Sequence, residues 1–142
     1  MFRTTRRVEF AETDMAGIVH FSNFFRYMES AEVEFLRSLG LSVTMRTEGQ
    51  RFGFPRVSAS CDYLRPATFQ DVIEVAVKIG NVGSKSVTYQ FEFRKAGELI
   101  ARGQVSTVCC RVIGEHQLES IEIPADIRAK LEAASGGCQP PG

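Results

Sequence analysis

The stretch Asn23–Leu39, NFFRYMESAEVEFLRSL, decides the fold. Apolar side chains recur in it at steps of three and four residues, which places them on one side of an α-helix. This stripe consists of Phe24, Met28, Ala31, Phe35 and Leu39. Further apolar residues widen the stripe, so we expect the helix to be covered on more than one side. Ser22 or Asn23 can cap its start, and Gly40 is well placed to end it.

The residues outside this helix have a period of two rather than 3.6. Apolar and polar side chains alternate, which is typical of strands with one buried face and one wet face. Turn residues such as Gly80–Gly83 and Ala96–Gly97 separate the alternating segments. The expected elements are strands at Arg3–Phe10, 57–63, 73–79, 87–94 and Leu99–Ile113, and a short terminal helix at Pro124–Ala133.

One apolar helix and several antiparallel strands have a simple packing solution. Only the helix can cover the apolar face of the sheet, so we expect the sheet to curl around it. This predicts an α+β fold in which a curved antiparallel sheet of about five strands wraps around one long helix. Residues 1–134 are expected to form a single domain, and 135–142 a flexible C-terminal tail. Free edge strands favour self-association, so we expect a homodimer or homotetramer.

The composition argues against several classes of function. Seventeen basic and seventeen acidic residues cancel, so no net charge attracts nucleic acid or an anionic membrane. No apolar run approaches the roughly 18 residues that span a bilayer, and the basic N-terminus lacks the apolar run of a signal peptide. We therefore expect a soluble cytoplasmic protein without membrane insertion.

The four cysteines and two histidines do not suggest a metal site. Cys109 and Cys110 are adjacent in a strand-like run, so their side chains should point to opposite faces. No C-x-x-C occurs, and neither histidine lies at a metal-ligand spacing from a cysteine. We expect reduced cysteines that act as small hydrophobic residues, and neither a metal nor a redox cofactor.

The loop before the helix, Glu12–Asn23, has the sequence ETDMAGIVHFSN. It is mostly apolar after Asp14, so we expect it to be partly buried together with this carboxylate. A carboxylate in an apolar pocket is a stronger base unless hydrogen-bond donors satisfy it. Gly17 lets the backbone turn tightly or approach a ligand closely. The loop leads to a helix N-terminus, and a carboxylate beside unpaired N–H groups suits acyl transfer.

The run Thr13–Phe24, TDMAGIVHFSNF, resembles the active-site motif of the 4-hydroxybenzoyl-CoA thioesterase-like hotdog proteins. The resemblance continues through Asp62–Ala67 and Asp71–Val75, and it spans about Val8–Ile113. It implies the hotdog fold, in which an antiparallel sheet wraps around a long helix. It also implies an acyl-CoA substrate: a small acyl- or aroyl-CoA of the 4-hydroxybenzoyl-CoA type, hydrolysed to the free acid and CoA.

The same resemblance implies roles for individual residues of the loop. Asp14 matches the catalytic carboxylate, acting as nucleophile or as general base for water. Gly17 matches the loop glycine, and the backbone N–H of Phe21 matches the donor that polarises the thioester carbonyl. Some family members have a histidine at the position of Phe21, whereas this chain has His20 one residue earlier. The role of His20 therefore stays open between general base and orientation of the loop.

A second set of candidates lies in the turn Gly83–Ser86. Family members commonly bind the CoA phosphates around this turn, so Ser84, Lys85 and Ser86 are substrate-binding candidates by resemblance. A lysine flanked by two hydroxyls suits contact with a phosphate. The alternative is a solvated hairpin tip. Arg65 is a weaker candidate, because exposed arginines are common.

Other interpretations of these residues stay open. Asp14 also fits an Asx turn, which is common for aspartate in loops. Ser22, His20 and Asp14 include the residue types of a catalytic triad, but G-x-S-x-G is absent and Ser22 fits a helix cap. Glu29 and Glu32 offer further carboxylates, although we expect helix glutamates to be solvated. A non-catalytic acyl-CoA or acyl-carrier binding module would need the pocket but not an ionised carboxylate.

Overall fold

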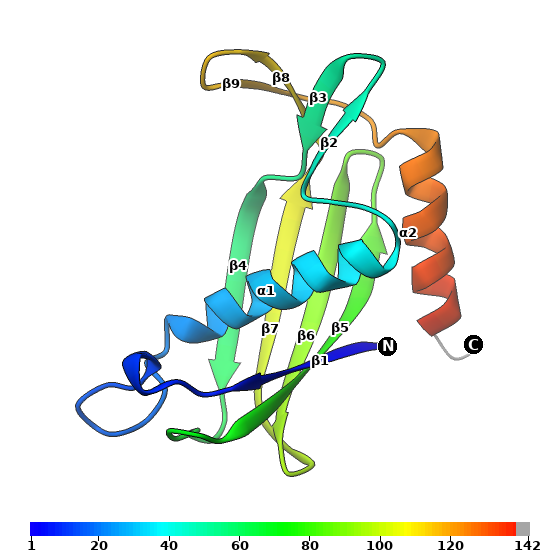
Figure 1. Ribbon diagram of the computed structural model, residues 1–142. Helices are drawn as coiled ribbons and strands as arrows, with labels where there is room; N and C mark the ends of the chain where they lie inside the picture. The colour runs from blue at the N-terminus through cyan, green and yellow to red at the C-terminus, as the bar shows by residue number, and fades with distance from the viewer. Residues whose placement is uncertain (139–142) are drawn as a thin grey trace.

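The computed structural model describes residues 1–138, which form an α+β fold built on an antiparallel sheet. The main sheet has five strands in the order β1-β5-β6-β7-β4, and helix α1 crosses one of its faces (Figure 1). The α+β class and the antiparallel pairing confirm the prediction from sequence. The bounds are β1 Phe2–Arg7, α1 Asn23–Ser38, β4 Arg56–Tyr63, β5 Val72–Val82, β6 Ser86–Lys95 and β7 Glu98–Val108.

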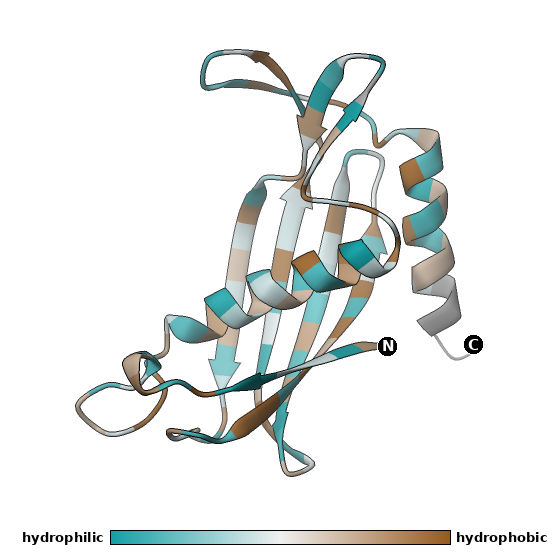
Figure 2. Ribbon diagram, viewed as in Figure 1, coloured by the Kyte–Doolittle hydropathy of each residue, from teal (hydrophilic) through white to brown (hydrophobic). Residues whose placement is uncertain are grey.

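The core lies between α1 and the sheet. Hydropathy alternates along the central strands (Figure 2), and the inward side chains of β6 are at most 1% exposed. These side chains are Val87, Tyr89, Phe91 and Phe93. From α1, Phe24 packs on Phe93 and Phe35 packs on Tyr89, with ring centroids 5.2 and 6.1 Å apart. The predicted stripe of the helix is therefore the face that is buried.

A second sheet was not predicted from the sequence. It has the order β2-β3-β8-β9 and lies beyond one end of the main sheet (Figure 1). The predicted strand Leu99–Ile113 is confirmed as far as Val108, but its end was wrong, because the chain leaves the main sheet at Cys109 and continues as β8 of the second sheet. The strands are β2 Thr44–Thr47, β3 Gln50–Gly53, β8 Cys110–Gly114 and β9 Gln117–Ser120.

The two ends of the chain also differ from the prediction. Strand β1 stops at Arg7, and Phe10–Glu12 form a short 3-10 helix, η1, because the Glu9 N–H donates to the Glu12 carboxylate and not to a neighbouring strand. The terminal helix α2, Ala125–Cys138, is longer than predicted. The predicted tail 135–142 therefore begins inside α2, and residues 139–142 lie outside the described part of the chain.

Strand β4 has more exposed side chains than its alternating pattern predicts. It pairs with β7, forms one edge of the sheet, and α1 leaves most of its inward face uncovered. Val57 is 63% exposed and Tyr63 is 43% exposed, although both were expected to face a core. In the single chain, this edge therefore presents both apolar side chains and unpaired backbone groups.

Glu32 contradicts the expectation that helix glutamates are solvated. Its side chain is 1% exposed, and its Oε1 accepts hydrogen bonds from Arg56 Nε at 3.3 Å and Nη2 at 3.2 Å. Its Oε2 has no partner among the described residues. Burial raises the pKa of the Glu32 carboxyl, and Arg56 opposes this shift. The pair connects the middle of α1 to the start of β4.

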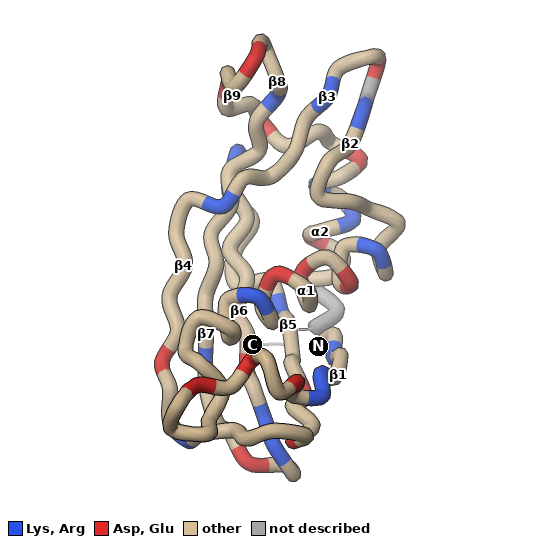
Figure 3. The backbone as a smooth tube through the Cα atoms, turned by 60° about the vertical axis from the view of Figure 1, so that its left-hand side comes forward, with Lys and Arg blue, Asp and Glu red and all other residues tan. Residues whose placement is uncertain are grey.

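Charges of both signs are interspersed along the backbone (Figure 3). Among residues 1–138, no cluster of histidine, cysteine or acidic side chains could hold a metal ion. Cys61, Cys109 and Cys110 are free thiols, as predicted. No helix in this part of the chain is long and apolar enough to cross a membrane.

Candidate active site

The loop between η1 and α1 is held in shape by its own backbone. The Asp14 N–H donates to the Ile18 carbonyl and the Gly17 N–H to the Asp14 carbonyl, both at 2.9 Å. Gly17 has φ +80°, and no other group lies within 4 Å of the position that a Cβ would occupy, so backbone conformation rather than space requires glycine here. The Val19 N–H donates to the Ala67 carbonyl at 2.8 Å, which attaches the loop to the segment after β4.

The loop is less buried than its composition predicts. Val19 is 4% exposed, but Met15 is fully exposed and Phe21 is 61% exposed. The loop projects from one end of the molecule (Figure 1). Val19 therefore packs into the core, whereas Met15 and Phe21 are largely exposed.

Asp14 lines a cavity of about 490 Å³ at the start of α1. Its Oδ1 accepts a hydrogen bond from the Ala16 N–H at 2.9 Å, so the predicted Asx turn is present. Its Oδ2 accepts no hydrogen bond from the described residues. The remaining lining is mostly apolar and aromatic: Ile18, Val19, Phe21, Phe24, Tyr63, Leu64, Arg65, Pro66 and Ala67.

The backbone at the helix entrance leaves one donor free. The Phe21 N–H donates no hydrogen bond to any of the described residues. The Phe21 carbonyl is fixed instead, because it accepts from the Tyr63 hydroxyl at 2.9 Å and from the Phe24 N–H at 3.3 Å. A free N–H at a helix N-terminus carries partial positive charge and favours an anion. The cavity is therefore lined by Asp14 and by Phe21, the residue that carries this N–H.

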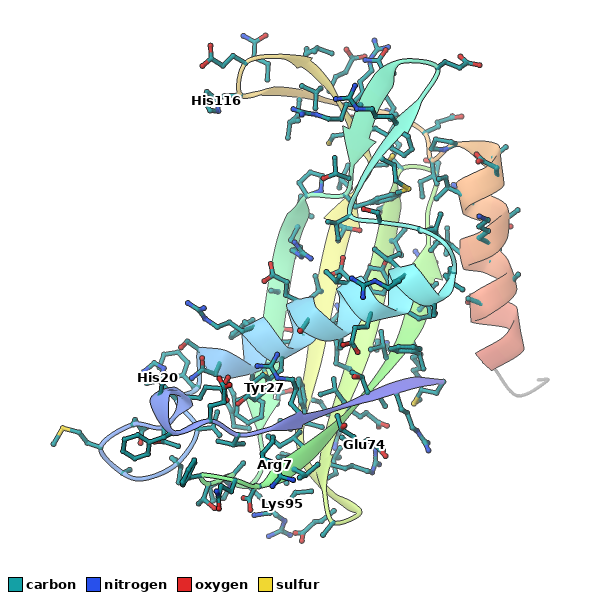
Figure 4. All side chains as sticks on the ribbon, in the orientation of Figure 1. Arg7, His20, Tyr27, Glu74, Lys95 and His116 are labelled. Carbon is teal, nitrogen blue, oxygen red and sulfur yellow. The ribbon has the colours of Figure 1, made fainter. Side chains whose placement is uncertain are left out.

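His20 serves the helix entrance in this structure. Its Nδ1 lies 2.7 Å from Ser22 Oγ and accepts from the Ser22 N–H at 3.3 Å. Both contacts use Nδ1, so Nε2 is the nitrogen left for other partners. Figure 4 shows His20 and Tyr27 at the same end of α1, while His116 lies at the far end of the molecule. These contacts are of the kind that orients a loop, and the role of His20 stays a prediction.

The structure brings only some of the predicted site residues together. Asp14, Phe21 and Arg65 line one cavity, and Arg65 forms an ion pair with Glu98. The turn with Ser84, Lys85 and Ser86 follows the other end of β5 (Figure 1). Because β5 has eleven residues, at about 3.3 Å per residue it separates the two sites by about 33 Å.

The turn itself is braced from the C-terminal side. The Ser84 carbonyl accepts from the Ile123 N–H at 3.0 Å and from Arg128 Nη2 at 3.0 Å. Arg128 Nη2 also donates to the Gly83 carbonyl. The backbone carbonyls of this turn are therefore occupied, while the Lys85 side chain is exposed.

Tyr63 is a site residue that sequence reasoning did not single out. Its ring packs on Phe24 and Phe21, with centroids 5.2 and 6.4 Å apart, and its hydroxyl fixes the Phe21 carbonyl. Tyr63 is 42 positions from Phe21 in the chain. The only sequence signal was its place in the second matching segment, Asp62–Ala67.

The antiparallel sheet is crossed by a helix whose entrance carries a carboxylate and, among the described residues, an unpaired N–H, the kinds of group that acyl transfer uses. Residues 8–131 match the thioesterase-like superfamily. The chain belongs to this superfamily, as the sequence motif implied.

Individual relatives support this assignment. A relative from Aquifex aeolicus (strain VF5), named only as an esterase, is 40% identical over 108 residues, covering 75% of this chain and 81% of that protein. The 4-hydroxybenzoyl-CoA thioesterase of Pseudomonas sp. (strain CBS-3) is 29% identical over 128 residues, covering 85% and 90%. The crystal structure of a 1,4-dihydroxy-2-naphthoyl-CoA thioesterase from Synechocystis has a TM-score of 0.78 at 27% identity, covering 92% and 94%.

Proposed function

We propose that this protein hydrolyses the thioester of a small aroyl- or acyl-CoA to the free acid and CoA. One observation carries the proposal: Asp14 and Phe21 belong to one loop and line one mostly apolar cavity, and the Phe21 N–H has no acceptor among the described residues. The N–H is suited to stabilise the oxyanion that forms when the thioester carbonyl is attacked. The superfamily match supplies the reaction class.

Two routes use this arrangement. In the nucleophilic route, an Asp14 oxygen attacks the carbonyl carbon, the C–S bond breaks, and CoA leaves as a thiolate that takes a proton from water. Water then hydrolyses the mixed anhydride and restores the carboxylate. In the general-base route, Asp14 accepts a proton from the water that attacks the carbonyl directly. Both routes place the oxyanion at the Phe21 N–H.

The lining of the cavity favours an aromatic acyl group of the 4-hydroxybenzoyl type. Phe21, Phe24 and Tyr63 present rings that can pack against a flat substrate. The relatives named above include enzymes for 4-hydroxybenzoyl-CoA and 1,4-dihydroxy-2-naphthoyl-CoA. We therefore expect aroyl-CoA esters to be better substrates than straight-chain acyl-CoA esters.

The test compares wild type with Asp14→Asn in an assay of free-thiol release, over aroyl-CoA and acyl-CoA substrates. We expect Asp14→Asn to lose about 10²–10⁴ in kcat, because it removes both the nucleophile and the base. The melting temperature serves as the control for folding. Equal turnover by the two proteins contradicts the role of Asp14. Tight binding of CoA esters without turnover by wild type identifies a binding module instead.

We also propose that the active form contains a second copy of the chain, paired antiparallel along β4. The edge of β4 is unpaired and its apolar side chains are exposed, which is the surface that a symmetric partner would cover. A two-fold axis at this edge reverses the direction of the partner's strands relative to those of the first copy. The partner's Lys85 turn then lies at the same end of the joined sheet as Asp14, where it can hold the CoA phosphates.

Subunit mixing tests this arrangement. Asp14→Asn and Lys85→Ala are each expected to lower kcat/KM, the latter by about tenfold for one charged hydrogen bond. If the Lys85 turn acts on the partner's site, random mixing restores about one quarter of the wild-type value, because half of the dimers hold one intact site. No recovery on mixing, or a monomer by light scattering, contradicts the proposal. Cys61, Cys109 and Cys110, the cysteines whose side chains the structure describes, are free thiols, which fits the reducing cytoplasm that we propose as the location of the protein.

A further inference from the structure

Glu12 lies where the end of β1, the loop and α1 meet, and its side chain is 12% exposed. Its Oε1 accepts from the Tyr27 hydroxyl and from the Glu9 N–H, both at 2.8 Å. Its Oε2 pairs with Arg6 Nη2 at 3.2 Å. Both carboxylate oxygens are therefore engaged, by groups from β1, η1 and α1. Such a carboxylate is held in one orientation, unlike Asp14 two residues later.

The backbone of the same residue holds the helix entrance. The Glu12 carbonyl accepts from the His20 N–H at 2.9 Å and from Asn23 Nδ2 at 2.8 Å. His20 and Asn23 lie on either side of Phe21 and Ser22 in the chain. The Glu12 carbonyl therefore holds the chain before and after Phe21, the residue that carries the free N–H.

The partners of the Glu12 side chain are themselves anchored. Tyr27 is 0% exposed, and burial together with the hydrogen bond to Glu12 raises its pKa, so its hydroxyl remains a donor. Arg6 lies over the Tyr27 ring, with Cζ 5.0 Å from the centroid, and donates to Ser30 Oγ at 3.2 Å. Through Tyr27 and Arg6, the Glu12 side chain is thus anchored to α1 and to β1.

From these contacts we infer that Glu12 is a positioning residue, which sets the distance between the Phe21 N–H and Asp14. The inference rests on the proposed function. Glu12 does not line the cavity, so its effect passes through the loop backbone. A misplacement of about 1 Å at a reacting group can cost about 10²-fold in rate. Loss of the Glu12 side chain leaves the burial of the second half of α1 unchanged.

The test uses Glu12→Ala and Glu12→Gln in the full-length protein. We expect Glu12→Ala to lower kcat by about 10- to 100-fold, with KM within about threefold, because substrate contacts stay in place. Glu12→Gln keeps an oxygen that accepts from Tyr27, so most of kcat should return. The matched control is Leu131→Ala in α2, which removes a side chain that is 1% exposed without touching the loop.

Two results overturn the inference. The first is a kcat for Glu12→Ala within twofold of wild type. The second is a fall in kcat no greater than that of Leu131→Ala, when both variants lose the same melting temperature. A second readout does not depend on turnover. Hydrogen exchange of the His20 amide should be faster in Glu12→Ala but unchanged in Leu131→Ala, and an unchanged rate in both contradicts the inference. Full activity of Asp14→Asn contradicts the proposed chemistry instead. The exchange rate of the His20 amide then still tests whether Glu12 positions the loop.

Discussion

The two ends of the main sheet differ in how their backbone groups are satisfied. At the end with the Asp14 loop, the Phe21 N–H is free and Met15, Phe21 and Leu64 are at least half exposed. At the opposite end, the carbonyls of the β5–β6 turn are occupied by Arg128 and by backbone N–H groups. Free donors and exposed apolar surface are what a ligand can use, whereas occupied carbonyls only hold the fold.

This difference predicts which measurement each substitution changes. At the loop end, substitutions should change the rate with little effect on stability. Substitutions of the groups that brace the turn, and of the Glu32–Arg56 pair between the two ends, should change stability first; the exposed Lys85 side chain, proposed above to bind phosphate, is the exception at the turn end. Each prediction below tests this separation between effects on rate and effects on stability, in order of decreasing expected effect.

The largest effect is expected for Arg56→Met. The substitution removes the group that pairs with a carboxylate that is 1% exposed, and an unpaired buried charge costs about 3 kcal/mol. The free energy of unfolding in urea at pH 7 measures this. Arg94→Met is the matched control, because the Arg94 side chain is also 34% exposed but pairs with Glu92, which is 37% exposed. Equal losses in the two variants would show that the burial of Glu32 does not matter.

Arg128→Ala should destabilise the protein by about 1–2 kcal/mol, because the Gly83 carbonyl loses its donor and the Ser84 carbonyl keeps only the Ile123 N–H. We expect kcat to stay within about twofold, since the turn lies far from Asp14 in the same chain. Glu132→Ala is the control: it removes the ion-pair partner of Arg128 but not the donor, and should cost less than about 0.5 kcal/mol. A large fall in kcat for Arg128→Ala would show that the bracing of the turn affects the chemical step and not only the stability of the fold.

Tyr63→Phe should act at the loop end alone. It removes the hydroxyl that fixes the Phe21 carbonyl and keeps the ring that lines the cavity. Loss of one hydrogen bond of about 1 kcal/mol predicts a fall in kcat of about fivefold, with a small change in melting temperature. Steady-state kinetics on the best aroyl-CoA substrate measures the effect. A rise in KM at constant kcat would assign Tyr63 to substrate binding instead.

The sequence predicted the parts of the molecule that depend on local periodicity. The apolar stripe of α1, the alternation in β5 and β6, and the loop with Asp14 and Gly17 follow from spacing or from a contiguous motif. The second sheet was missed because Thr44–Thr47 and Gln117–Ser120 are short and show no apolar alternation. Pairings across many residues were also missed, including Tyr63 with Phe21 and Arg56 with Glu32.

The smallest effect is expected for His20→Gln. The His20 Nδ1 contacts Ser22 Oγ and the Ser22 N–H, which orients the residue just before α1, and its backbone N–H donates to the Glu12 carbonyl. A glutamine keeps a side-chain acceptor, and substitution leaves the backbone bond in place, so the rate should stay within about tenfold. The pH profile of kcat sharpens the test, because a histidine that acts as general base gives the profile a limb that His20→Gln removes. If His20→Gln loses 100-fold or more and removes such a limb, His20 is the base, and the loop end then contains two catalytic groups rather than one.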